Sequence, residues 1–385
     1  MTLKVCIHGH FYQPPREDPW TGMLPNQPSA APFHDWNQRI QDECYRPNCR
    51  AMILDEGGDV ASRCNTYRHI SFNFGPTLLR WMREHDTRSY DDILRADREA
   101  VEATGHGNAI AQAYHHAILP LASARDKQTE VAWGVADFKH RFGREPVGMW
   151  LPECAIDIAS LEVLADHGIQ FTIIAPDQVE AIRPIEGGEW QTVDAGSVPT
   201  HQPYAVELPS GRRMAVFVYH GGVSQGIAFG GLLHSGPEMA KALVKAGTHG
   251  GLVSIATDGE SYGHHHRHGE MALAWVIDEF SRLPDVEMVS YERYLALHPP
   301  TRELRIKNPS AWSCAHGVGR WNRNCGCAID PAWSGKQGWR GPLRRALEDL
   351  RNQLDEDYVL TMHSRGLDPW TERNHYIHSL SLIHI

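Results

Sequence analysis

The sequence predicts an α/β protein with a mostly parallel sheet. Short runs rich in Val, Ile, Leu and aromatic residues have the length of buried strands, and stretches with apolar residues at helical spacing lie between them. This alternation is typical of parallel strands covered by helices. Two of the strand-like runs also end in acidic residues, as expected where the carboxyl ends of parallel strands build a site.

The strands and helices are expected at defined places in the chain. The expected strands are residues 5–8, 147–151, 171–174, 216–219, 252–256 and 286–290. The expected helices are residues 75–86, 91–104, 130–142, 160–167, 238–246 and 271–283. Residues 18–32 and 182–209 have little periodicity, and we expect them to be insertions that leave the strand ends and contribute to a site.

The composition changes after about residue 299. Residues 308–339 are rich in Trp, Gly and Cys, and residues 341–358 have the pattern of a charged helix with leucines at helical spacing. We expect an α/β domain over residues 1–300. We expect residues 301–385 to be a Trp/Cys-rich segment and a mainly helical, incomplete C-terminal domain.

The composition and net charge of the chain argue against some classes of binding partner. The chain has 385 residues and a formal net charge of −10, which argues against a nucleic acid or an anionic membrane as partner. No apolar run approaches the roughly 20 residues of a membrane span, and the N-terminus lacks the anatomy of a signal peptide. We therefore expect a cytoplasmic protein whose oligomeric state is open.

Two acids follow two of the expected strands. Glu153 comes after residues 147–151, and Asp258 comes after residues 252–256. Taken alone, Glu153 could cap a helix and Asp258 could belong to a turn. Together they favour cleavage of a glycosidic bond, in which one carboxylate attacks or stabilises the sugar cation and the other protonates the leaving oxygen. A retaining mechanism needs the two about 5–5.5 Å apart.

Histidines supply a second set of polar candidates. His8 and His10 alternate along the first strand, so their side chains point the same way. They could bind a metal, or they could hydrogen-bond to sugar hydroxyls and to the carboxylates. His116 is a weaker candidate, and residues 264–266 most simply lead into the following helix.

Four motifs, in order, resemble those of glycoside hydrolase family 57. They are HGHFYQP at residues 8–14, the ILPL-containing segment 105–121, WLPECA at residues 150–155 and DGESYG at residues 258–263. The resemblance covers about residues 1–300 and implies an incomplete (β/α)7 barrel and a retaining enzyme that acts on α-glucans. It implies that Glu153 is the nucleophile and Asp258 the general acid/base, with Glu260 as a neighbouring support.

The remaining candidates are expected to bind the sugar. Aromatic rings with a few polar groups suit a carbohydrate pocket, because the C–H faces of sugars are apolar and their hydroxyls need partners. The expected substrate-binding residues are His8, His10, Gln13, Trp150, Glu260, Tyr262, His116, Trp312 and Trp321. The expected partner is an oligosaccharide or polysaccharide, and no cofactor is expected.

Two short motifs after residue 310 bring three cysteines and a histidine close in sequence. Cys314, His316, Cys325 and Cys327 are a ligand set that suits tetrahedral zinc. Their spacings are tighter than the common C-x2-C knuckle. The alternative places Trp312, Trp321 and their neighbours over the barrel mouth as a lid, with the cysteines as small packing residues. The sequence favours the lid, and no metal is expected.

Two other functions remain open at this point. A metal-dependent polysaccharide deacetylase on a related barrel could use His8, His10 and Asp258 as metal ligands. A carbohydrate-binding protein that has lost catalysis is the other alternative. The sugar, its linkage and the choice between hydrolysis and transglycosylation depend on loop geometry and are left open.

Overall fold

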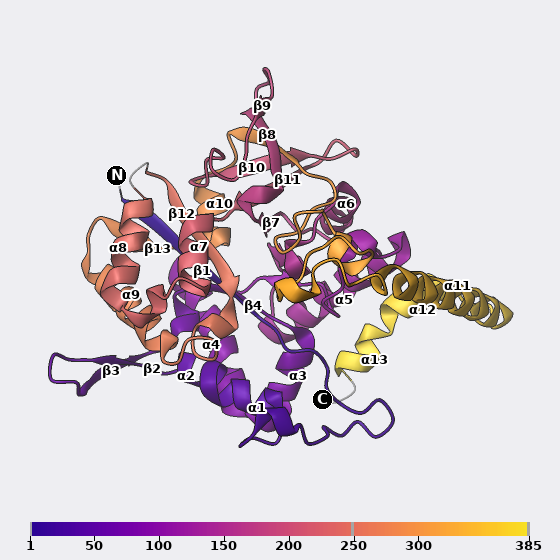
Figure 1. The fold of residues 1–385 in the computed structure, drawn as a ribbon, viewed down its shortest axis with the longest axis horizontal. Helices are drawn as coiled ribbons and strands as arrows, with labels where there is room; N and C mark the ends of the chain where they lie inside the picture. The colour runs from indigo at the N-terminus through magenta and orange to yellow at the C-terminus, as the bar shows by residue number, and fades with distance from the viewer. Residues whose placement is uncertain (1, 248–249, 383–385) are drawn as a thin grey trace.

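The protein is built around a central strand, β1 (Leu3–Phe11), in the computed structural model, which describes residues 2–247 and 250–382 (Figure 1). β12 (Leu252–Asp258) runs parallel to β1 on one side, in a register that places His10 opposite Asp258. β4 (Ser71–Phe74) and β13 (Val286–Met288) also pair with β1 in parallel. The predicted mostly parallel α/β fold is confirmed.

The remaining strands continue the sheet around an open barrel. An isolated parallel bridge joins β4 to the segment before β5 (Ala111–Gln112), which pairs with β6 (Met149–Trp150). A second bridge leads to β7 (Phe171–Ile174), which pairs in parallel with β11 (Arg213–Val218). Just after β11, the amide of His220 donates to the carbonyl of Ser254 in β12, 2.6 Å away. This hydrogen bond connects the last strand of the series to β12.

Helices surround these strands (Figure 1). Those of the barrel region are α1 (Trp36–Ile40), α2 (Arg46–Asn48), α3 (Pro76–His85), α4 (Thr87–Thr104), α5 (Ala124–Phe142), α6 (Ile158–Asp166), α7 (Gly221–Ala228), α8 (Gly236–Ala246), α9 (Gly269–Arg282) and α10 (Tyr291–Leu297). Each helix predicted between residues 75 and 283 is present. The glycine after α6 has a positive φ, as expected for a helix C-cap.

The prediction of an irregular insertion over residues 182–209 is only partly right. β8 (Val179–Pro184), β9 (Gln191–Thr192), β10 (Pro203–Glu207) and β14 (Arg302–Ile306) extend the β7–β11 sheet in the order β7-β11-β10-β14-β8-β9. These strands form because β10 pairs antiparallel with β11, a partner that lies outside the insertion. A separate hairpin, β2 (Ala51–Leu54) and β3 (Val60–Cys64), protrudes from the barrel (Figure 1).

The C-terminal part differs in character. Residues 308–339 are irregular apart from the short 3-10 turns Gly319–Trp321 and Pro331–Trp333. α11 (Arg340–Ser364) then projects away from the barrel, followed by α12 (Pro369–His375) and α13 (Ile377–Leu382) (Figure 1). The leucines predicted to form a stripe on α11 are 49–58% exposed. Within the described residues, no helix has both the length and the apolar character needed to span a membrane.

Candidate active site

Glu153 and Asp258 line one recess at the carboxyl end of the barrel strands. The recess has a volume of about 450 Å³. Its other lining residues are Pro176, Asp177, Tyr219, Gly221, Ser224, Gln225, Ala228, Phe229, Ala256, Thr257, Trp312, Ser313, Arg320 and Ile329. The two acids are a hundred residues apart in sequence, and parallel strands deliver both to the same cavity.

The backbone at Glu153 is strained. Strand β6 ends at Trp150, and the chain turns through Pro152–Cys154, where Glu153 has φ 59° and Cys154 has φ 47°. A positive φ is costly for residues that carry a Cβ, by about 1–2 kcal/mol each. The amides of Cys154 and Ala155 close this turn by hydrogen bonds to Leu151 and Pro152. Strain of this kind is typical of functional sites, where it fixes the direction of a side chain.

A segment from the C-terminal part holds the Glu153 carboxylate. The Trp312 indole Nε1–H and the Ser313 hydroxyl both donate to Oε2 of Glu153, at 3.0 and 2.5 Å. The amide of Trp312 also donates to the Glu153 carbonyl, 3.0 Å away. The Trp312 ring lies edge-on to Trp150 at 5.2 Å between ring centroids. Residues 312–313 therefore orient one oxygen of the acid and cover it.

Asp258 has an environment that favours its protonated form. It ends β12, and its side chain is open to the recess although protein surrounds it. Desolvation by the surrounding protein, and then the negative charge of Glu153, raise the pKa of Asp258 to about 6. A carboxyl group with a raised pKa that shares a recess with a second acid is the arrangement expected of a general acid and its partner.

Glu260, two residues after Asp258, is buried. Its Oε1 accepts hydrogen bonds from the Tyr45 hydroxyl at 2.6 Å and from the Tyr12 amide at 3.2 Å. Burial, and then the charge of Asp258, raise the pKa of Glu260 to about 7. The intervening Gly259 is required by packing, since a Cβ there would come within 2.2 Å of the Phe11 ring. Glu260 is thus a buried support for the strand end.

The histidines of β1 form a stacked, hydrogen-bonded layer with Trp150, Asn73 and His116. The rings of His8 and His10 stack on Trp150 at 5.1 and 4.9 Å. Asn73 lies within hydrogen-bonding distance of both rings, and His10 Nε2 lies 3.0 Å from His116 Nε2. The four rings and the amide therefore make one continuous network that leads from the first strand to the acid site.

These imidazoles are neutral near pH 7. Burial lowers the pKa of His8 to about 3 and that of His116 to about 4. Burial and the neighbouring His116 lower the pKa of His10 well below its ordinary value. Neutral imidazoles offer one donor and one acceptor each, which suits the positioning of hydroxyls and carboxylates.

Of the nine predicted substrate-binding residues, Trp312 lines the recess and the other eight do not. Gln13 donates to the Tyr45 hydroxyl at 3.1 Å, and that hydroxyl in turn donates to Glu260. Tyr262 is fully buried, and its hydroxyl lies 3.3 Å from that of Thr257. Trp321 lines a different groove, beside α11. Of the predicted aromatic lid, Trp312 alone lies against the acids.

Several residues of the site were missed by the sequence analysis. Asn73 lies on β4, whose SFNF sequence alternates over only four residues, too few to predict a strand. Tyr45, which holds Glu260, lies in a short π-helical turn, Gln41–Tyr45, with no motif to mark it. Ser313 contacts Glu153 only because residues 308–339 fold back over the barrel.

A donor set for a metal lies elsewhere. Among the described residues, the group of His, Cys and acidic side chains close enough to share one ion is Cys314, His316, Cys325 and Cys327. His8, His10 and Asp258 do not form such a group within the same residues. The deacetylase interpretation needs these three as ligands, so the geometry speaks against it.

Comparison with known families agrees with this site. The sequence profile of glycosyl hydrolase family 57 matches residues 18–307. The profile of a domain of unknown function (DUF3536) matches residues 333–382.

Two curated relatives match short parts of the chain. A 1,4-α-glucan branching enzyme of Thermococcus kodakarensis is 41% identical over 66 residues, 17% of this chain and 10% of that protein. α-Amylase 1 of Dictyoglomus thermophilum is 24% identical over 106 residues, 27% of this chain and 15% of that protein. The chain therefore spans only a small part of the length of these relatives.

Solved structures share the fold over most of the chain. A maltose-forming amylase from a Pyrococcus species has a TM-score of 0.70 at 16% identity, covering 98% of this chain and 66% of its own. An α-amylase from Thermotoga maritima has a TM-score of 0.59 at 12% identity, and the match covers 100% of this chain and 97% of that protein. With the family profile matching most of the chain and the four motifs in place, the chain belongs to glycosyl hydrolase family 57.

Proposed function

We propose that the protein is a retaining glycoside hydrolase or glucanotransferase that acts on α-glucans or related oligosaccharides. One observation carries this proposal: Glu153 and Asp258 share a recess in which Glu153 is oriented by two donors and the pKa of Asp258 is raised to about 6. Double displacement at a sugar acetal requires a carboxylate as nucleophile and a second carboxyl group as general acid/base, close to each other.

In the first step, a Glu153 carboxylate oxygen attacks the anomeric carbon, and the bond to the leaving oxygen breaks. Asp258 gives its proton to that oxygen, so the leaving group departs as a neutral hydroxyl. In the second step, the Asp258 carboxylate takes a proton from water or from an acceptor hydroxyl, whose oxygen attacks the anomeric carbon and releases Glu153. Water gives hydrolysis, and a sugar hydroxyl gives transfer.

The names of similar proteins support the substrate class. The matched relatives and structures include a branching enzyme, amylases and a 4-α-glucanotransferase. The apolar faces of Tyr219, Phe229 and Trp312 in the recess also suit the C–H faces of a sugar ring. A carbohydrate-binding protein without catalysis would have no use for the strained, doubly held Glu153.

The test is a reaction of the full chain with maltooligosaccharides and amylose, followed by chromatography of the products and proton NMR of the first product formed. We expect an α-configured product, shorter chains with water as acceptor, and longer chains if transfer occurs. E153Q and D258N should each abolish turnover and keep the wild-type unfolding temperature, whereas the exposed control E189Q should behave as wild type. Full activity in either acid variant, or a β-configured product, would contradict the mechanism.

The free state of the cysteines supports a reducing, cytoplasmic location. All eight cysteines lie in the described part of the chain, and the structure holds each as a free thiol. Persistent free thiols are typical of a reducing compartment. Cell fractionation with an antibody to the protein tests this, and recovery from an extracytoplasmic fraction would contradict it.

A further inference from the structure

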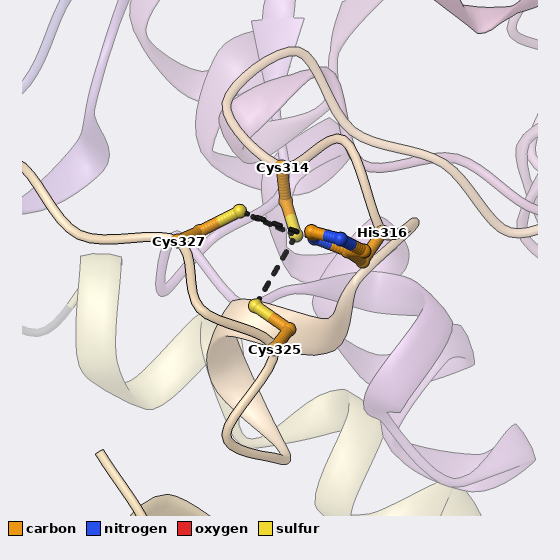
Figure 2. A group of neighbouring side chains, drawn as sticks. All are labelled: Cys314, His316, Cys325 and Cys327. Carbon is orange, nitrogen blue, oxygen red and sulfur yellow. Dashed lines mark hydrogen bonds between the residues drawn. The ribbon is translucent and has the colours of Figure 1, made fainter. Parts of the chain in front are cut away.

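Four sulfur and nitrogen donors converge beside the acid site, in two loops that the proposed reaction does not use. Cys314 and His316 come from one turn, and Cys325 and Cys327 come from the next (Figure 2). Figure 2 shows the four side chains pointing toward one another, and their donor atoms all lie within 4.8 Å of one another. Cys314 is 5% exposed, so the group reaches from the interior to the surface.

The distances fit a single tetrahedral ion. Zinc bonds of about 2.3 Å to sulfur and about 2.0–2.1 Å to imidazole nitrogen imply edges of about 3.8 Å between sulfurs and about 3.6 Å between sulfur and nitrogen. Cys314 Sγ lies 3.9 Å from Cys325 Sγ and 3.8 Å from Cys327 Sγ. His316 Nδ1 lies 3.4 Å from Cys327 Sγ. These three distances match the edges of a zinc tetrahedron, and the remaining ones are at most 4.8 Å.

The backbone also has the shape of a metal-binding turn. Gly326, between the two cysteines of the second motif, has φ 88°, a conformation that favours glycine. The chain bends at this residue, and the side chains of Cys325 and Cys327 both point toward Cys314 (Figure 2). Packing alone does not explain this arrangement, because small apolar side chains would fill the space without bringing three thiols and an imidazole within 4.8 Å of one another.

We propose that Cys314, His316, Cys325 and Cys327 bind one Zn²⁺ ion in a structural site. Three thiolates and an imidazole are a complete ligand set, with no open position for a substrate or a water. The spacing argues against a two-iron cluster, whose ligands would divide between two separated metal ions. The sequence favoured an interpretation in which the cysteines are small packing residues. That interpretation does not explain why the four donor atoms lie so close together.

The ion would fix the segment that holds Glu153. Ser313, which donates to Glu153, directly precedes Cys314 in the chain. Arg320, between the two motifs, donates from Nη1 to the Ser313 carbonyl at 2.9 Å and lines the acid recess. Because residues 308–339 contain few regular elements, a metal cross-link would replace the rigidity that strands supply elsewhere.

Metal analysis and cobalt spectroscopy test the site without reference to activity. Protein purified without chelator should contain about one zinc per chain by plasma mass spectrometry. After chelator treatment under reducing conditions, Co²⁺ alone should give a thiolate-to-cobalt charge-transfer band and the intense visible bands of tetrahedral cobalt, and Zn²⁺ should displace it. A cobalt spectrum without charge transfer, or the spectrum of an iron–sulfur cluster in the purified protein, would overturn the proposal.

Cysteine variants locate the ion. C325S should weaken cobalt binding at least about 100-fold and, because two thiolates remain, lower the charge-transfer band at saturating Co²⁺ to roughly two thirds. The matched control C64S, a half-buried thiol in β3, should bind cobalt as wild type does. If C325S folds poorly, the wild-type cobalt spectrum still decides the question. Loss of the ion in C64S with full binding in C325S would overturn the assignment. Since these readouts need no substrate, the zinc site and the proposed catalysis can fail independently.

Discussion

The barrel and the segment 308–339 position their functional side chains by different physical means. In the barrel, β1 and β12 pair continuously from Lys4↔Leu252 to His10↔Asp258, so the register fixes where each side chain points. Segment 308–339 has only two isolated bridges, Ile156↔Ser310 and Ala311↔Cys314, and two short turns. Its side chains are held by individual hydrogen bonds and by the proposed ion.

This difference has a consequence for the two halves of the Glu153 site. The strand end and its strained turn belong to the barrel and are stabilised by a large core. The donors to Oε2 belong to the segment and depend on a few contacts that can be removed one at a time. Changes in the barrel half should therefore abolish function, and changes in the segment half should weaken it.

The largest expected effect comes from E153G. Glycine accepts the positive φ at this position, so the variant should fold at least as stably as E153A while losing at least about 10⁴-fold in kcat. Azide should restore turnover by attacking the anomeric carbon in place of the missing carboxylate, and NMR should show a glycosyl azide of inverted configuration. E153G without azide rescue, or with activity near wild type, would remove Glu153 as the nucleophile.

The next largest effect is that of pH. Because Asp258 must be protonated and its pKa is about 6, kcat/KM should fall about tenfold per pH unit above that value, or about 100-fold by pH 8. A profile of kcat/KM from pH 4 to pH 9 measures this limb. A profile that stays flat up to pH 8 would mean that another group protonates the leaving oxygen.

Removing the proposed ion should have an intermediate effect on the segment half. We expect C325S to lower kcat/KM by about 10–100-fold, the range found when groups that support a site are lost. C64S should not lower it, and urea unfolding of the barrel should be nearly unchanged in both variants. Equal activity in C325S and C64S would show that residues 312–313 hold their place without the cluster.

Removing one donor should have a smaller effect. S313A loses one hydrogen bond to a charged oxygen and keeps that of Trp312, so kcat/KM should fall about tenfold. S281A, an exposed serine on α9, is the control and should be unchanged. A loss in S313A as large as that in E153G would mean that the segment takes part directly in the reaction.

The last expected effect is on stability rather than on catalysis. The pKa of buried Glu260 is raised to about 7, so between pH 4.5 and 7 the folded state keeps a proton that the unfolded state releases, and the free energy of unfolding falls as pH rises. E260Q has no such group. Between pH 5 and pH 8 its free energy of unfolding should therefore fall by about 2–3 kcal/mol less than that of the wild type. Urea unfolding at both pH values measures the difference, and parallel losses would contradict the raised pKa.

Much of the barrel half could be predicted from the sequence. The strands that carry His8, Glu153 and Asp258 are short apolar runs, and their acids follow where such runs end. The short strands β4 and β5 were missed because two to four residues give little periodicity, and with them Asn73 and its contacts to both histidines. The domain limits over residues 1–300 and 301–385 stay a prediction.

The sequence by itself determined the parallel α/β fold and the two acids, because hydrophobic periodicity and strand-end position are local properties of the chain. Only the tertiary structure decided that Ser313 and Trp312 reach Glu153, that Tyr262 is buried and does not line the recess, and that Cys314 and His316 meet Cys325 and Cys327. These contacts join segments through loops without a repeating pattern. Their geometry is set by the packing of the whole molecule rather than by neighbouring residues.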